Sequence, residues 1–147
     1  MVAILPGSRP NELRCILPDL VRAARRIRRD VPNAQFVVAR APDLTDALFE
    51  PVNALNEARP TTARIVEAQT DAVLAAADVV LTASGTATVQ TAIHERPMVV
   101  VYRLSPLTYR IIRRFVHIDT FGMVNLVAGQ KGKAVMEGGD LSAGLYW

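Results

Sequence analysis

The chain has 147 residues, half of them apolar, which excludes a disordered protein and favours one domain with a single hydrophobic core. Its apolar runs, such as Met98–Tyr102, are far shorter than the roughly 20 residues that a transmembrane helix needs. The net charge of +3 rests mainly on arginine, and a single cysteine, Cys15, excludes an intrachain disulfide and a cysteine-rich zinc site.

Short apolar segments alternate with helix-like segments along most of the chain. The predicted strands are Val2–Leu5, Gln35–Ala39, Ala63–Glu67, Asp78–Thr82 and Met98–Tyr102. The predicted helices are Pro10–Arg29, Pro42–Glu57, Thr70–Ala77, Thr86–Glu95 and Pro106–Val116. This alternation favours a parallel sheet with right-handed crossovers, so the predicted fold is α/β, a Rossmann-like sheet with helices on both faces.

The first predicted helix has leucines at helical spacing and a dense group of arginines in its second half. Pro10 falls in the first turn, where its missing N–H costs little, whereas Pro18 is expected to kink the helix. The arginines favour a solvated helix face, with an anionic partner as the alternative; nucleic acid is not expected, because no aromatic residues are interleaved with them. They are Arg22, Arg25, Arg26, Arg28 and Arg29.

The last part of the chain is rich in glycine and shows no sustained hydrophobic period. We therefore expect a Rossmann-like domain over residues 1–128. Residues 129–147 are expected to be mostly irregular, or foreign to the natural domain.

Two loops that follow predicted strands contain residues suited to an anion, and ligands of such sheets bind beyond the carboxyl ends of the strands. After the first strand, Gly7 permits a sharp turn and Ser8 can cap the helix. Arg9 adds a permanent positive charge at a helix start, where free N–H groups already favour an anion.

The second loop, Ala83–Thr88, follows the fourth strand. Gly85 permits a close approach to the backbone, and the hydroxyl groups of Ser84, Thr86 and Thr88 can cap the helix or bind ligand oxygens. Neither loop has the G-x-G-x-x-G or G-K-[ST] pattern of the usual nucleotide sites. Taken alone, this loop fits a plain capped helix start as well as it fits a phosphate site.

In this order, the segments LPGSR, AADVVLTASGTATVQ, ERPMVVVYRLSPLTYRIIRRFV and VNLVAG resemble the C-terminal half of the lipid-A-disaccharide synthase family, over about residues 2–130. The resemblance implies an inverting glycosyltransferase of the two-domain GT-B architecture, in which this half holds the donor's nucleotide. The implied reaction joins UDP-2,3-diacylglucosamine to the lipid acceptor 2,3-diacylglucosamine 1-phosphate and releases UDP. The resemblance implies a further N-terminal domain, with the presumed catalytic base, to which no part of these residues corresponds, so we expect these residues alone to be an inactive fragment.

The same resemblance implies roles for individual residues. Arg9 corresponds to the arginine that contacts the diphosphate and stabilises the leaving group, as positioned donors do in general. The rest of the implied donor site consists of Gly7, Ser8, Ser84, Gly85, Thr86, Ala87, Gln90 and Asn125. No metal or cofactor is expected, because Asp-x-Asp is absent and the two histidines, His94 and His117, are distant in sequence.

Two positions depart from the family pattern. Gln90 stands where the family has a glutamate for the ribose hydroxyls, so the charge-assisted hydrogen bond is lost. Gly122–Asn125 lacks the proline of the family's S-L-P-N segment.

The predicted helix Pro106–Val116 has an apolar stripe, expected to pack on the sheet, and a basic flank of Arg110, Arg113 and Arg114. In an enzyme with lipid substrates this flank could rest on an anionic membrane surface. The expected location is the cytoplasm, because the chain begins without a basic leader and a signal peptide is not expected. A peripheral position on the inner face of the bacterial inner membrane is the alternative.

Two other functions stay open. Another UDP-sugar enzyme of this architecture, such as an epimerase, would need catalytic carboxylates and a second domain. A non-catalytic binding module or degenerate remnant is the other alternative, and Gln90 and the unusual tail keep it open.

Overall fold

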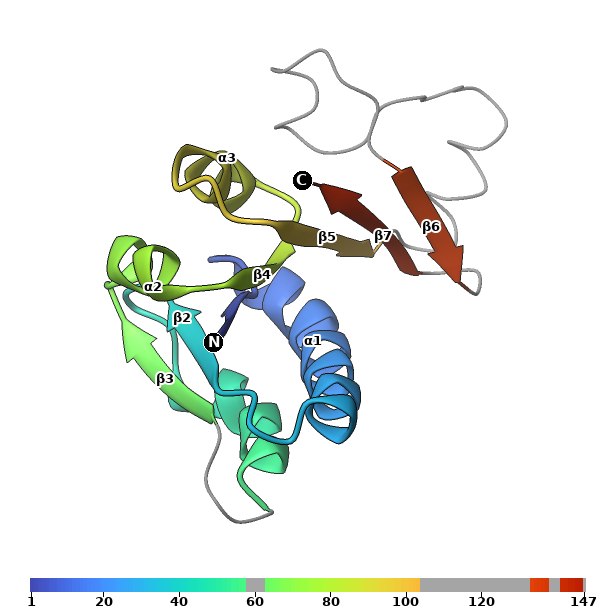
Figure 1. Cartoon of the computed structure of the whole chain (residues 1–147). Helices are drawn as coiled ribbons and strands as arrows, with labels where there is room; N and C mark the ends of the chain where they lie inside the picture. Colours follow the sequence, from blue (N-terminus) through green and yellow to red (C-terminus); the bar gives the residue numbers. More distant parts are fainter. Residues whose placement is uncertain (58–62, 104–132, 138–140, 147) are drawn as a thin grey trace.

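The computed structural model of the protein describes residues 1–57, 63–103, 133–137 and 141–146. These residues form a seven-stranded sheet in the order β3-β2-β1-β4-β5-β7-β6 (Figure 1). The strands are β1 (Val2–Leu5), β2 (Phe36–Arg40), β3 (Ala63–Glu67), β4 (Val79–Ala83), β5 (Met98–Arg103), β6 (Lys133–Glu137) and β7 (Leu141–Tyr146). β1 to β5 pair in parallel, which confirms the predicted Rossmann-like α/β arrangement.

The helices between the parallel strands cover both faces of the sheet (Figure 1). They are α1 (Pro10–Asp30), the 3-10 helix η1 (Asp46–Leu55), α2 (Thr70–Ala76) and α3 (Thr86–Ile93). The core of one face is formed with α1 and η1, and that of the other mainly with α2, against which α3 also packs.

The central strand β1 shows how the sequence divides between these two cores. Its four residues are all buried, as expected for a parallel strand covered on both faces. Val2 and Ile4 belong to the core beneath α1 and η1, whereas Ala3 and Leu5 belong to the core beneath α2. Successive side chains therefore point to opposite faces, and the short apolar segment serves both layers.

The helix α1 confirms the predicted span to within one residue. Leu13, Leu17 and Leu20 are fully buried, in agreement with their helical spacing. Pro10 occupies the first turn, and Pro18 lies inside the helix, which continues past it to Asp30.

The predicted helix Pro42–Glu57 differs from the structure, which has the shorter η1 with 3-10 geometry. The N–H of Leu48 donates to the carbonyl of Thr45 at 3.1 Å, a bond of i→i+3 type. Pro51 lies inside η1 and lacks an N–H, so it cannot join a regular α-helical ladder.

The C-terminal residues also differ from the prediction of a mostly irregular segment over residues 129–147. β7 pairs antiparallel with β5, and β6 pairs antiparallel with β7, so both strands extend the sheet. The free edge of β5 offers unpaired backbone groups, and pairing with them does not require a hydrophobic side-chain period. The expectation of irregular structure is wrong for these two strands.

Among the described residues, no helix combines the length and the apolar character that crossing a membrane would require.

Candidate functional site

The strand order reverses between β1 and β4, whose following helices, α1 and α3, lie on opposite faces of the sheet. In open α/β sheets such a reversal leaves a crevice beyond the carboxyl ends of the strands. The structure has a cavity of about 490 Å³ at this place. It is lined by every predicted donor-site residue that the structure describes: Gly7, Ser8, Arg9, Ser84, Gly85, Thr86, Ala87 and Gln90.

Gly7 makes the turn that leads from β1 into the cavity. Its φ of +99° lies in the left-handed region, which side chains disfavour. A Cβ at this position would meet Cβ of Ala83 and Oε2 of Glu12, each at 3.7 Å, which is ordinary contact. Glycine is therefore required here by backbone conformation, more than by space.

Arg9, and not Ser8, is the N-cap residue of α1, and no side chain among the described residues makes a capping hydrogen bond there. The predicted capping by Ser8 is therefore wrong. Ser8 and Arg9 are both exposed where they line the cavity. The Nη1 group of Arg9 donates a hydrogen bond of 2.9 Å to Oε1 of Glu12, one turn into the helix.

Gly85 begins the second side of the cavity as the N-cap residue of α3. Apart from the two adjacent residues, no atom of the described part of the chain lies within 4 Å of the position that a Cβ would occupy there, so the backbone is open to a close neighbour. No side chain caps α3 either. The first N–H groups of a helix have no acceptor inside the helix, so those of Thr86 and Ala87 are suited to an anion.

The hydroxyl groups of this loop divide into two kinds. Thr88 is fully buried, and its Oγ1 donates to the carbonyl of Gly85 at 2.7 Å. Its predicted role as a cap or ligand contact is therefore wrong. Ser84 and Thr86 are exposed and line the cavity, and the N–H of Ser84 donates to the carbonyl of Val101 at 3.1 Å. This bond anchors the loop to β5.

Gln90 lies one helical turn after Thr86, on the same side of α3, and its side chain is exposed at the cavity. It brings a neutral acceptor and donor to the site. The positive charge comes from Arg9 and the start of α3, while the carboxylate of Glu12 partly offsets it.

The carboxyl group of Asp78 has a pKa below its ordinary value, because the N-terminal ammonium of Met1 donates a hydrogen bond to it and attracts it electrostatically. Asp78 lies at the amino end of β4, whereas the cavity lies at the carboxyl ends of the strands. This carboxylate therefore belongs to the junction between α2 and β4.

Two polar residues of the cavity, Glu12 and Thr70, are not among those that the sequence patterns predict. Glu12 could have been found from its position three residues after Arg9, since such pairs meet on a helix. Thr70 is the first residue of α2, which follows β3. Its place at the cavity could be predicted only with the knowledge that β3 pairs with β2.

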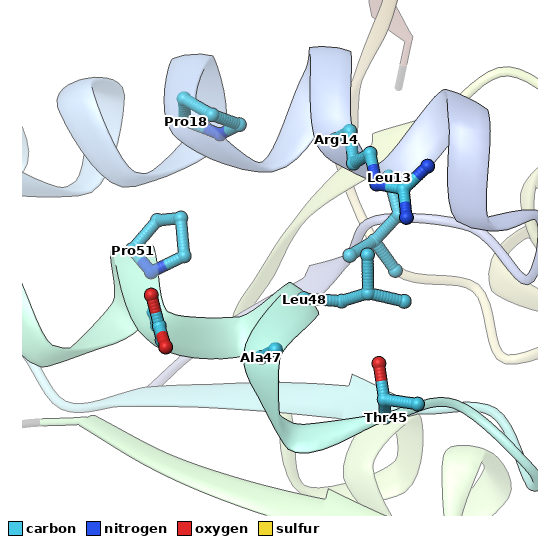
Figure 2. Close-up of a pocket in the computed structure, with 8 residues that line it drawn as sticks. Leu13, Arg14, Pro18, Thr45, Ala47, Leu48 and Pro51 are labelled. Atoms are coloured by element: carbon cyan, nitrogen blue, oxygen red, sulfur yellow. The ribbon is translucent and has the colours of Figure 1, made fainter.

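A second cavity, of about 510 Å³, lies between α1 and η1. Figure 2 shows Leu13, Arg14 and Pro18 of α1 on one side and Leu48 and Pro51 of η1 on the other. None of the predicted site residues that the structure describes lines it. The first cavity, with two helix starts and an arginine, is the better candidate for an anionic ligand.

The remaining predicted features lie elsewhere. His94 ends α3 as its C-cap, and its Nε2 lies 3.1 Å from Oδ1 of Asp71 on α2, so it links two helices. Within the described residues, no cluster of three or more potential metal ligands occurs. Asn125, the predicted helix Pro106–Val116 and its three arginines lie outside the described residues.

Comparison with known proteins gives one consistent result. The family model described as "Lipid-A-disaccharide synthetase" matches residues 1–138. A lipid-A-disaccharide synthase from Anaeromyxobacter sp. (strain K) is 44% identical over 129 residues, which are 88% of this chain and 33% of that protein.

Two further relatives with the same description are more distant. The protein from Myxococcus xanthus is 38% identical over 130 residues, which are 88% of this chain and 33% of the relative. The protein from Geobacter sulfurreducens is 33% identical over 131 residues, or 89% of this chain and 33% of the relative. The chain thus spans about a third of the length of these curated relatives.

Proposed function

Because the chain belongs to the lipid-A-disaccharide synthase family, we propose that residues 1–128 form the donor-nucleotide-binding part of such a glycosyltransferase. The whole enzyme would join UDP-2,3-diacylglucosamine to 2,3-diacylglucosamine 1-phosphate and release UDP. One observation carries this proposal. Two loops far apart in sequence, Gly7–Arg9 and Ser84–Ala87, line one cavity beside the start of α3.

The diphosphate of the donor fits the positive side of this cavity. Arg9 presents a planar guanidinium, which can donate two parallel hydrogen bonds to phosphate oxygens. The open backbone at Gly85 lets a phosphate approach the N–H groups that begin α3. The exposed hydroxyls of Ser84 and Thr86 add further donors at the same place.

These groups also suit the chemistry of the proposed reaction. Cleavage of the sugar–phosphate bond develops negative charge on the departing UDP. Fixed donors that face this charge stabilise the transition state more than the ground state. Arg9 and the α3 backbone would thus assist departure, whereas the base that activates the acceptor hydroxyl would come from an N-terminal domain.

Two neutral side chains complete the proposed donor site. Gln90 would accept a hydrogen bond from a ribose hydroxyl, and Asn125 would lie near the donor. The basic flank of Arg110, Arg113 and Arg114 would rest on an anionic membrane surface that supplies the lipid substrates.

Calorimetric titration of UDP into the full chain tests the proposal, with Arg9→Ala as the decisive variant. We expect saturable binding that weakens at least about tenfold in Arg9→Ala, since hydrogen bonds to charged groups are among the stronger ones. Arg26→Ala removes an exposed arginine from the same helix outside the cavity and should leave the affinity unchanged. A flat titration from a folded sample would contradict the proposal and favour a degenerate remnant.

A further inference from the structure

Glu12 is the one acidic residue that lines the cavity among the described residues. It lies in the first turn of α1, and its Oε1 accepts the 2.9 Å hydrogen bond from Nη1 of Arg9. Its other oxygen, Oε2, lies 3.7 Å from the position that a Cβ on Gly7 would occupy. The carboxylate thus lies between the arginine and the turn that leads out of β1.

A carboxylate at this position is unexpected for a site that binds a diphosphate, because it repels the ligand. An acidic side chain in the first turn of a helix does interact favourably with the helix dipole. Glu12, however, directs one oxygen to the Arg9 side chain, and no side chain caps the backbone at this helix start. The hydrogen bond that Glu12 accepts therefore comes from the guanidinium of Arg9 and not from the backbone at the helix start.

The Arg9 side chain has little else to hold it in place. It is 79% exposed, and Glu12 provides the one ion pair recorded for it within the described residues. An arginine side chain has about 2 kcal/mol of rotamer entropy to lose when it becomes ordered. A partner already present in the unliganded protein removes part of this loss before a ligand binds.

The contact leaves Arg9 able to bind a second anion. A guanidinium has five N–H donors, and the hydrogen bond to Glu12 uses one on Nη1. Two parallel bonds to phosphate oxygens need two further donors, and Nε and Nη2 still carry theirs. Glu12 can thus keep its bond while the diphosphate takes the remaining donors.

We infer that Glu12 is a positioning residue, which orients the Arg9 guanidinium for the diphosphate of the donor; this inference rests on the proposed function. Glu12 makes no contact with the ligand in this role. Its benefit is the order that it gives to Arg9, and this exceeds the repulsion between its charge and the diphosphate.

A double-mutant cycle on the full chain, read by UDP calorimetry, separates this role from a purely electrostatic one. Glu12→Gln keeps the size of the side chain but removes the charge that faces the ligand. If electrostatic repulsion dominated, this variant would bind UDP more tightly. We expect it to bind about two- to fivefold more weakly, in keeping with the strength of exposed ion pairs.

The cycle also tests whether Glu12 acts through Arg9. In the Arg9→Ala background, adding Glu12→Gln should no longer weaken binding, because the group that it orients is gone. Arg22→Gln is the matched control, since Arg22 pairs with Asp19 at the same spacing on the same helix, outside the cavity. This variant should bind UDP like the wild type.

An NMR measurement without ligand separates the positioning role of Glu12 from the proposed binding of UDP. Relaxation of the Arg9 Nε–Hε group should show greater disorder in Glu12→Gln than in the wild type. Tighter or unchanged UDP binding in Glu12→Gln, equal weakening in both backgrounds, or an unchanged Arg9 signal would overturn the positioning role. A folded wild-type chain that binds no UDP would overturn the proposed function, and the NMR comparison would then decide the orientation of Arg9 by itself.

Discussion

Gly7 and Ala83 bring the two halves of the candidate site together: a Cβ on Gly7 would lie 3.7 Å from Cβ of Ala83. Gly7 lies two residues after the end of β1, and Ala83 is the last residue of β4, next to the pair in which Leu5 is in register with Thr82. The loops that start there are thus held at a fixed separation by the sheet. Arg9 and Gly85 lie on these two loops, so the sheet also fixes how far apart they are, and both can contact the same small ligand.

Gly7→Ala should reduce stability. The φ of +99° at Gly7 disfavours any side chain, and a non-glycine residue in left-handed conformation costs about 1–2 kcal/mol. Because the space around the new Cβ is ordinary, no further clash is expected. Urea unfolding would measure the loss, and a decrease below about 0.5 kcal/mol would contradict this account of the turn.

Gly85→Ala should weaken ligand binding and also reduce stability. The added methyl group meets no atom of the described residues within 4 Å apart from its chain neighbours, although the φ of +158° is one that side chains rarely adopt. The methyl group would occupy the space through which a phosphate approaches the start of α3. We expect UDP affinity to fall about tenfold or more. The free energy of unfolding should also fall, because the backbone at Gly85, with φ +158° and ψ −161°, lies in a region that only glycine adopts readily. Calorimetry and urea unfolding of Gly85→Ala measure the two effects; unchanged UDP affinity would remove this loop from the site.

Gln90→Glu should strengthen UDP binding if this side chain meets the ribose. A carboxylate accepts a stronger, charge-assisted hydrogen bond from a hydroxyl than a neutral amide does. We expect the affinity for UDP to rise about three- to tenfold. The gain should vanish with 2′,3′-dideoxy-UDP, which lacks both hydroxyls, and weaker UDP binding would indicate that residue 90 faces the diphosphate instead.

Arg40 should matter for stability without touching the ligand. Its guanidinium pairs with Asp46 and lies 3.5 Å from Glu67, and it also donates to the carbonyl of Leu44. It stacks 5.3 Å from the ring centre of Phe49. These contacts join the ends of β2 and β3 to the start of η1. Arg40→Ala should therefore lower the free energy of unfolding by about 2 kcal/mol.

The matched control for Arg40 is Arg64→Ala, which removes an exposed arginine from the edge strand β3. It should change stability by less than about 0.5 kcal/mol. Both variants can be compared by thermal or urea unfolding. An equal, small effect in the two would mean that the Arg40 contacts do not contribute to stability.

The parallel layer could be predicted because local sequence determines most of it. The strand Ala63–Glu67 has the predicted bounds, and the leucines of α1 are buried as their spacing indicated. The loops after β1 and β4 could be identified as one site because the carboxyl ends of parallel strands lie at the same edge. The sequence already contained the small residues and the arginine that such an edge needs for an anion.

The missed features depend on interactions that local patterns do not contain. The 3-10 geometry of η1 follows from Pro51 within an otherwise helix-like segment. The pairing of β7 with β5 is a backbone interaction between segments distant in sequence. Glu12 lines the cavity because its carboxylate accepts a hydrogen bond from Arg9. The sequence did not indicate this, because an acidic residue in the first turn of a helix is usually explained by its favourable interaction with the helix dipole.

The central place of β1 has a consequence for how the chain reaches this structure. Val2 pairs with Phe36 on one side and with Val79 on the other, so its second partner lies more than half the described chain away. Contacts of such long range slow folding, because the loop must close before they form. During synthesis β1 and β2 can pair early, but the edge that β4 will cover stays open until that strand emerges. The cavity is complete only once β4 has paired with β1 and α3 has formed after it, so ligand binding reports that these two strands have paired correctly.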